Sequence, residues 1–215
     1  MMIPTDYKEI KKAVVRSQHC QRNFDLTKEV PQEDIDLMVY AATNCPSKQN
    51  ISFYTLHVVT DKKLIEQIHE LSTGVTADNV QTGEREIETT NSQTLANVLF
   101  VYERKKLEDL TPTAMEKWMR ADDAEIAVFE RDVATALGIS AGYVNFIASM
   151  MGYATGCCQC FQKEKIRELM GLKYGPDLLM GIGYTDESRN RRIHATQPDL
   201  KFPTRKKEEI QVFYR

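Results

Sequence analysis

The chain has 215 residues and a formal net charge of −3, and 42% of its residues are hydrophobic and 27% charged. These values are typical of a soluble globular protein of one domain, long enough to bury about 70% of its unfolded surface. The small net charge provides no general attraction to nucleic acid or anionic lipid. No charged leader precedes an apolar segment and no apolar run reaches about 18 residues, so we expect neither secretion nor membrane insertion.

The cysteines and the clustered basic residues have simple expected roles. Five cysteines, three of them crowded at Cys157, Cys158 and Cys160, are not typical of a disulfide framework and indicate a reducing, cytoplasmic location. The four histidines show no ligand spacing, so we expect no metal site. The arginines at 189–192 and the basic residues at 205–207 are expected to be solvated surface patches rather than polyanion sites, unless one of them meets a single phosphate.

The first elements follow from apolar spacing and proline. The spacing predicts a short amphipathic helix over residues 7–15, followed by an irregular polar segment at 16–24. Pro31 is expected to open a second helix, because proline fits the first helical turn. This helix should end at 44–46, where Pro46 restricts the residue before it. The next expected elements are a polar loop at 46–50, a strand at 52–60 and a helix at 62–71.

The middle of the chain contains one clear strand between two irregular segments. Residues 72–90 show no clear period and carry two glycines, which predicts a mobile loop or lid. The near-continuous apolar run at 95–102 indicates a strand that is buried on both faces. Residues 103–122, which contain Trp118, are predicted to be irregular or weakly helical.

A long helix is the central feature of the sequence. Its apolar residues recur at spacings of three and four from about Asp123, which predicts roughly 28 residues, or about 40 Å of helix. The helix is apolar nearly all round and should be buried. It is also rich in small residues such as Gly138 and Gly142, which let another backbone approach closely. We therefore expect it to pack against a second subunit, with the core helix of a monomer as the alternative.

The remaining elements complete an α+β pattern. The long helix should end at Gly152, and Gly156 and the cysteines after it should form a turn that exposes backbone amides at one place. A helix at 162–170 and a buried strand at 178–184 are expected next, and the glycines of this strand suggest close approach of another backbone. A polar tail leads to a strand-like segment at 210–214, which would pair with its own sheet or with a neighbouring subunit. Few strands and large helices indicate one central sheet.

Common signatures of chemistry are incomplete or missing. Cys157 and Cys160 form a C-x-x-C, but they follow a long helix, whereas the dithiol motif of thioredoxin-like proteins follows a strand. No G-x-G-x-x-G, P-loop or G-x-S-x-G occurs, which disfavours a dinucleotide-binding Rossmann domain.

What remains is a dispersed pattern over nearly the whole chain. Its pieces are, in chain order, QHCQRNFD at 18–25, ATNCPSKQN at 42–50, Asn91 with Gln93, the long helix and following turn at 132–160, LLMGIGYTDE at 178–187, and Arg205. Together these pieces resemble the FMN-dependent nitroreductase family and occur in that family's order. The most specific piece is the one at 42–50, which is similar to the family's A-x-x-x-P-S-x-x-N segment.

This resemblance implies an α+β fold of three α/β/α layers, with a central mostly antiparallel sheet and a long central dimer helix, in one domain over residues 1–215. Residues 186–215 would form a C-terminal extension that pairs with the partner subunit. The implied activity is that of a homodimeric FMN oxidoreductase. NADH or NADPH would deliver hydride to the flavin, and an acceptor such as a nitroaromatic or a quinone would then take it in ping-pong chemistry, without a catalytic side chain.

The same resemblance implies which residues contact FMN. Arg22 would lie at the pyrimidine edge, where a cation stabilises the negative charge that develops at N1 and O2. Arg205 would contact the phosphate, which suits a planar guanidinium. Backbone amides of Gln159 and Cys160 would face flavin N5. The complete set of implied contacts is Gln18, His19, Cys20, Arg22, Asn91, Gln93, Cys157, Cys158, Gln159, Cys160 and Arg205 from one subunit, with Pro46, Ser47 and Asn50 from its partner.

Several positions depart from the family pattern. Gln18 and Cys20 stand in place of its arginine and serine, and Pro203 stands in place of a basic residue, so two phosphate-binding charges are missing. The candidates to replace them are Arg16, Lys201 and Lys206. Three alternatives stay open: specialised flavin chemistry such as reductive dehalogenation or flavin breakdown, a thiol redox protein that uses Cys157 and Cys160, and a protein that keeps the fold and binds FMN without turnover.

Overall fold

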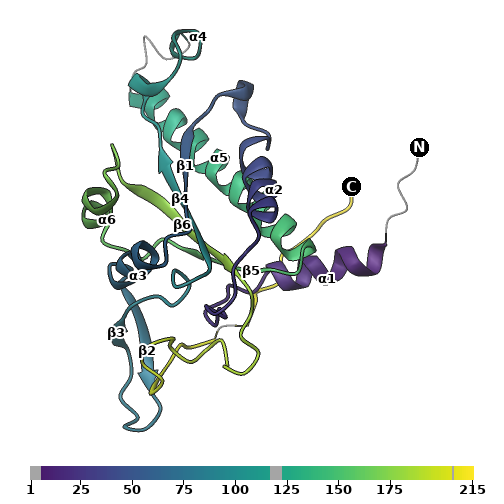
Figure 1. The fold of residues 1–215 in the computed structure, drawn as a ribbon. Helices are drawn as coiled ribbons and strands as arrows, with labels where there is room; N and C mark the ends of the chain where they lie inside the picture. The colour runs from purple at the N-terminus through teal and green to yellow at the C-terminus, as the bar shows by residue number, and fades with distance from the viewer. Residues whose placement is uncertain (1–5, 117–122, 205) are drawn as a thin grey trace.

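The structure is a computed structural model that describes residues 6–116, 123–204 and 206–215. Its helices are α1 (Tyr7–Ser17), α2 (Gln32–Thr43), α3 (Lys62–Glu70), α4 (Pro112–Met115), α5 (Asp123–Met150) and α6 (Lys163–Met170), with short 3₁₀ turns η1 (Lys48–Asn50) and η2 (Leu107–Asp109). Its strands are β1 (Tyr54–Val59), β2 (Val75–Asn79), β3 (Ile87–Thr89), β4 (Val98–Arg104), β5 (Ala154–Cys158), β6 (Pro176–Gly183) and β7 (Leu200–Lys201) (Figure 1). The longer helices and the strands β1, β4 and β6 lie where apolar spacing predicts them, with small shifts at their ends.

The central sheet has the strand order β1-β4-β6-β5 within the described residues, and each of its pairs is antiparallel. β4 lies inside this sheet. Successive side chains of a strand alternate between faces, so Val98, Phe100 and Tyr102 join one hydrophobic cluster. Leu99 and Val101 join a second cluster on the opposite face. Burial on both faces explains the near-continuous apolar run of this strand.

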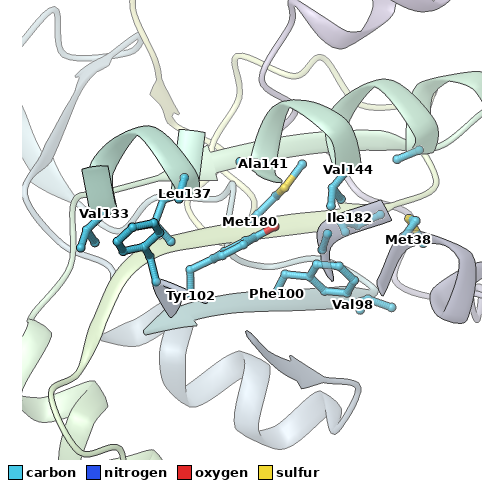
Figure 2. Close-up of a cluster of buried hydrophobic side chains, with 14 of the residues drawn as sticks. Met38, Val98, Phe100, Tyr102, Val133, Leu137, Ala141, Val144, Met180 and Ile182 are labelled. Carbon is cyan, nitrogen blue, oxygen red and sulfur yellow. The ribbon is translucent and has the colours of Figure 1, made fainter. Parts of the chain in front are cut away.

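Helices cover both faces of the sheet, which confirms the predicted three layers (Figure 1). α2 and α5 cover the face of Phe100, and Figure 2 shows Leu137 and Val144 of α5 directly over β4 and β6. α3 and α6 cover the other face through Ile68 and Ile166. Each such fully buried aliphatic side chain contributes about 1.5–3 kcal/mol. These contacts hold the strand ends that carry the candidate site.

α5 has 28 residues and confirms the predicted central helix. It ends in a Schellman motif at Gly152, which has a φ of +93°. The Gly152 N–H donates to the Ser149 carbonyl oxygen at 3.2 Å, and the Tyr153 N–H donates to the Ala148 carbonyl oxygen at 2.8 Å. By length and composition alone α5 is sufficient to cross a bilayer, but it packs into the main core cluster, as a core helix does. Only 44% of its most apolar window is buried, so one face stays exposed in the single chain.

The glycines of β6 let the chain before β4 cross the sheet closely, as their presence predicted. A Cβ on Gly181 would meet the carbonyl oxygen of Gln93, and a Cβ on Gly183 would meet the side chain of Asn97. Because neither position has a side chain, the segment 91–97 lies directly against β6. This contact determines where Asn91 and Gln93 lie.

Residues 72–90 differ from their prediction as a loop. They contain β2 and β3, which form a second sheet of order β3-β2-β7 within the described residues. Its small core consists of Ala77, Leu200 and Phe202. The apolar alternation in β2 is too short to predict a strand, and its partner β7 lies near the other end of the sequence.

Two other segments also differ from their predictions. The centre of the predicted turn after α5 is strand β5, whose small residues have weak strand preference and whose pairing with β6 therefore decides its conformation. Residues 210–214 are exposed and form no strand with their own sheet within the described residues. Their pairing with a neighbouring subunit, the other expected arrangement, stays a prediction. Trp118 and the other residues of 117–122, together with Arg205, lie outside the described residues.

Candidate functional site

The segment 18–22, which follows α1, packs against β5 and forms one wall of the candidate site. The Gln21 N–H donates to the Thr155 carbonyl oxygen at 2.8 Å. Gly156 permits this approach, because a Cβ there would lie 2.6 Å from the Gln21 carbonyl oxygen and 3.1 Å from Cβ of Gln93. Three parts of the chain that are distant in sequence therefore meet at the backbone of Gly156.

Asn91 and Gln93 are buried beside β5 and hold each other in place. Asn91 Nδ2 donates to Gln93 Oε1 at 2.7 Å, and Asn91 Oδ1 accepts from the Gln93 backbone N–H at 3.2 Å. Asn91 Nδ2 also lies 3.0 Å from the sulfur of Cys158. The structure thus brings two of the predicted amide residues together with the cysteine-rich segment.

Two buried histidines support Asn91 from behind. His194 Nδ1 accepts from the backbone N–H groups of Thr196 at 3.2 Å and Gln197 at 3.1 Å, so its Nε2 carries the proton and donates to the Thr90 carbonyl oxygen at 2.9 Å. The Thr90 hydroxyl lies 3.0 Å from His69 Nε2, and His69 Nδ1 donates to the Asn91 carbonyl oxygen at 3.2 Å. Burial lowers the pKa of His69 to about 4 and also lowers that of His194. Both rings are therefore neutral, and the network is uncharged.

Arg22 is the cation of this group. Its guanidinium lies over the Phe202 ring, with Cζ 4.8 Å from the ring centroid, in a cation–π contact. Burial lowers the pKa of Arg22, and the nearby charge of Arg191 lowers it further, while Cys20 and Cys158 oppose this change. Nε of Arg22 is buried and has no hydrogen-bond partner among the described residues. Because an unpaired buried donor costs about 1–3 kcal/mol, this atom indicates a ligand that accepts a hydrogen bond.

The two thiols of β5, Cys157 and Cys158, lie in environments that make them unreactive. Cys157 faces the cluster under α5, and Cys158 faces the cluster under α3 and α6. Burial raises the pKa of Cys157 to about 12 and that of Cys158 to about 11. Since the thiolate is the reactive form, both stay protonated at neutral pH. This environment disfavours the thiol redox alternative.

The other predicted contacts of the first group lie around the same wall. Gln159 and Cys160 follow the end of β5 and are exposed. Gln159 Nε2 donates to the Asp177 carbonyl oxygen at 3.4 Å, and Cβ of Cys160 lies close to Gly74 at the start of the β2–β3 hairpin. The remaining residues are exposed on the segment after α1: Gln18, His19 and Cys20.

The second predicted group, Pro46, Ser47 and Asn50, lies at the opposite end of the sheet. These residues join α2 to β1, and β1 begins where Tyr54 pairs with Arg104 at the C-terminal end of β4 (Figure 1). Asn91 and Gln93 of the first group directly precede the N-terminal end of β4. Seven residues of strand place these ends about 20 Å apart, so one chain does not bring both groups to one ligand.

Sequence reasoning missed the contribution of the C-terminal segment to the wall. Arg191 Nη1 donates to the Cys20 carbonyl oxygen at 3.2 Å, and Lys207 Nζ donates to Gln18 Oε1 at 3.4 Å. Arg191 was expected to belong to a solvated surface patch unless one of the basic residues met a phosphate, and the structure adds that it contacts the backbone of this wall. In the sequence, only the clustering of the arginines at 189–192 pointed to a role for them. Their contact with the segment 18–22 is visible only in the folded chain.

The three cations that the sequence offered as phosphate ligands are placed elsewhere or make no contact with the wall. Arg16 Nη1 donates to the Ser149 carbonyl oxygen at 2.8 Å and so caps the end of α5. Lys201 belongs to β7, where its backbone lies opposite that of Asp78 in the antiparallel pairing with β2. Lys206 is exposed.

An antiparallel sheet with helices on both faces defines an α+β protein of three layers. The model of the nitroreductase family matches residues 15–184, so the chain belongs to this family. The sequence matches none of the curated proteins with which it was compared.

Solved structures of similar fold support the same architecture. They include B. megaterium NfrA2, with 16% identity over 86% of this chain and 69% of that chain and a TM-score of 0.64. A candidate nitroreductase in complex with FMN from Exiguobacterium sibiricum 255-15 has 16% identity, coverage of 88% and 92%, and a TM-score of 0.62. A candidate NAD(P)H:FMN oxidoreductase from Staphylococcus epidermidis ATCC 12228 has 18% identity, coverage of 88% and 92%, and a TM-score of 0.59. At these identities the likeness establishes the fold.

Proposed function

We propose that the chain is an FMN-dependent oxidoreductase that takes hydride from NADH or NADPH and passes it to a small acceptor such as a nitroaromatic or a quinone. The observation that carries this proposal is Arg22, a half-buried cation whose buried Nε has no partner among the described residues, in a chain of the nitroreductase family. The pyrimidine edge of a flavin offers carbonyl oxygens and a ring nitrogen that accept such hydrogen bonds. The Exiguobacterium protein of similar fold is in complex with FMN.

The chain's part in this reaction is to bind and orient. When bound, FMN supplies the redox chemistry, and the two substrates use the same face in turn. Arg22 places positive charge where the ring becomes negative on reduction. Asn91 and Gln93 present amide groups that their mutual hydrogen bond holds in place. The exposed backbone at Gln159 and Cys160 offers N–H donors without requiring a particular side chain.

We further propose that each site forms between two chains. The loop of Pro46, Ser47 and Asn50 lies about 20 Å from Asn91 within one chain, across the length of β4. A partner subunit related by twofold symmetry can place its own copy of this loop over the wall. The proposed assembly is therefore a homodimer with two equivalent sites.

Two exposed features support this dimer. Gly138 and Gly142 lie one helical turn apart on α5, both are exposed, and a Cβ on either would meet nothing within 4 Å. This face lets another helix approach closely. In the C-terminal extension, Ile210 and Phe213 are 77% and 74% exposed, which favours a partner subunit as their contact.

The position of the second sheet and the state of the cysteines support two smaller proposals. The β2–β3 hairpin begins beside Cys160, so we propose that residues 72–90 cover one side of the site. All five cysteines are free thiols, which suits a reducing cytoplasm.

The absorbance spectrum of the purified protein tests the function. We expect flavin absorbance that bleaches with NADH or NADPH under anaerobic conditions and returns when a nitroaromatic or quinone is added. A colourless protein that binds no added FMN would refute the proposal. Bound FMN that neither nucleotide bleaches would identify a binding protein without turnover, and loss of the flavin itself during aerobic reduction would identify flavin breakdown.

A further inference from the structure

Positive charge gathers on the segment 18–22 without a matching negative charge. Arg191 donates to the Cys20 carbonyl oxygen at 3.2 Å, and Lys207 donates to the Gln18 side chain at 3.4 Å. Arg22 belongs to the same segment and is near enough to Arg191 for the two charges to act on each other. Among the described residues, no carboxylate forms an ion pair with any of these cations.

Several basic side chains elsewhere on this net-acidic chain have carboxylate partners. Lys48 pairs with Asp132 at 2.5 Å, and Asp177 pairs with Arg104 at 2.5 Å and with Lys163 at 2.9 Å. Like charges that face one another without a counterion destabilise the fold. The cations around segment 18–22 therefore indicate a bound anion.

We propose that Arg191 and Lys207 bind the phosphate group of FMN at the segment where Gln18 and Cys20 carry no charge. The inference rests on the proposed function. A phosphate monoester carries nearly two negative charges at neutral pH. A guanidinium can bind two of its oxygens at once, and an ammonium adds a point charge. Both cations come from the C-terminal segment, so docking of that segment on the N-terminal one completes the subsite.

The neighbouring arginines show why Arg191 is the residue available for this role. Arg189 faces Asp186 at 3.8 Å, so its charge is already balanced. Arg192 Nε donates to the Phe202 carbonyl oxygen at 3.2 Å. Arg191 uses one of its five N–H donors on the protein, which leaves the others for an anion.

Equilibrium binding of FMN and of riboflavin, which lacks the phosphate, tests this subsite on the intact chain after removal of bound flavin. Flavin fluorescence reports both affinities. We expect Arg191→Gln to weaken FMN binding by about 10- to 100-fold, and Lys207→Gln by about 2- to 5-fold because this side chain is exposed. Neither change should alter the affinity for riboflavin. The control Arg167→Gln removes the same charge from α6 and should change neither affinity.

The ratio of the FMN and riboflavin affinities decides the outcome. Arg191→Lys keeps the charge without the planar fork and should recover part of the lost FMN affinity. If Arg191→Gln has the same ratio of FMN affinity to riboflavin affinity as the wild type, the inference is overturned. An equal loss of both affinities through local unfolding leaves this ratio unchanged and therefore also overturns it. A selective loss of NADPH over NADH with an unchanged flavin ratio would assign the cations to the dinucleotide, and also overturns it. A wild-type protein that binds neither flavin refutes the proposed function itself.

Discussion

Gly156 determines how closely the segment 18–22 can approach β5. A methyl group on this residue would lie 2.6 Å from the Gln21 carbonyl oxygen and 3.1 Å from Cβ of Gln93, and neither atom can rotate away. We expect Gly156→Ala to lower the free energy of unfolding by about 1–3 kcal/mol. Flavin binding should weaken as well, because the wall of the site must shift. Urea denaturation and flavin titration measure the two effects.

The control for this substitution is Gln67→Ala, an exposed change on α3 that lies outside the site and the proposed dimer contact. Exposed substitutions of this kind change the free energy of unfolding by about 0.5 kcal/mol or less. The free energy of unfolding should therefore stay close to that of the wild type. A similar decrease in both variants would show that Gly156 has no special role.

His69 makes the stability of the fold depend on pH. Burial lowers its pKa from 6.5 to about 4, so the folded chain holds the neutral ring at pH values where the unfolded chain takes up a proton. The free energy of unfolding should be constant with respect to this group above about pH 6.5. It should fall as the pH decreases toward about 4, by up to roughly 3 kcal/mol.

His69→Gln tests this origin of the pH dependence. The variant should lose stability at neutral pH, because its hydrogen bonds change, but its unfolding free energy should depend less steeply on pH between about 4 and 6.5. Urea denaturation at several pH values gives the slope. Gln67→Ala, an exposed change on the same helix, should keep the wild-type slope. An unchanged slope in His69→Gln would assign the dependence to other groups.

Arg22 was assigned to the flavin from the resemblance of residues 18–25 to the family pattern, and this role stays a prediction. The sequence left open that one residue of the basic clusters meets a phosphate, but it could not single out Arg191 or Lys207. These two residues reach the segment 18–22 only when the C-terminal part of the chain folds back on it. No spacing within the sequence reports such a contact.

At the scale of elements, the exposed small residues of α5 carry the proposed dimer contact. In the single chain nothing lies within 4 Å of a Cβ on Gly138, so Gly138→Leu should fold without an internal clash. Across a twofold interface the larger side chain would clash in both subunits. We expect the dimer dissociation constant to rise about 30-fold or more. Sedimentation velocity measures this constant, with Gln67→Leu, a similar enlargement on the exposed side of α3, as the control that stays dimeric. A Gly138→Leu variant that dimerises normally would place the interface elsewhere.

Whole elements differ in how well their sequences predict them. α5 was predictable because 28 residues repeat one apolar spacing, and the packing of its own side chains satisfies that pattern. β2 and β5 were not, because each is short and takes its conformation from a partner strand far away in the sequence. β4 lies between these cases: its apolar run predicts a strand buried on both faces, but not which strands lie beside it.

At the scale of the whole molecule, the separation of Asn50 from Arg22 predicts that mixed dimers recover function. Arg22→Gln and Asn50→Asp should each impair flavin binding as homodimers. Aspartate tolerates the φ of +56° at position 50, so the second change should preserve the loop. If each site combines Arg22 of one subunit with Asn50 of the other, a heterodimer of the two variants has one intact site and one doubly altered site. After subunit exchange at equal amounts, about a quarter of the wild-type flavin sites should return. Each variant exchanged with itself should recover none. A mixture that also recovers none, while heterodimers are present, would mean that each site forms within one chain.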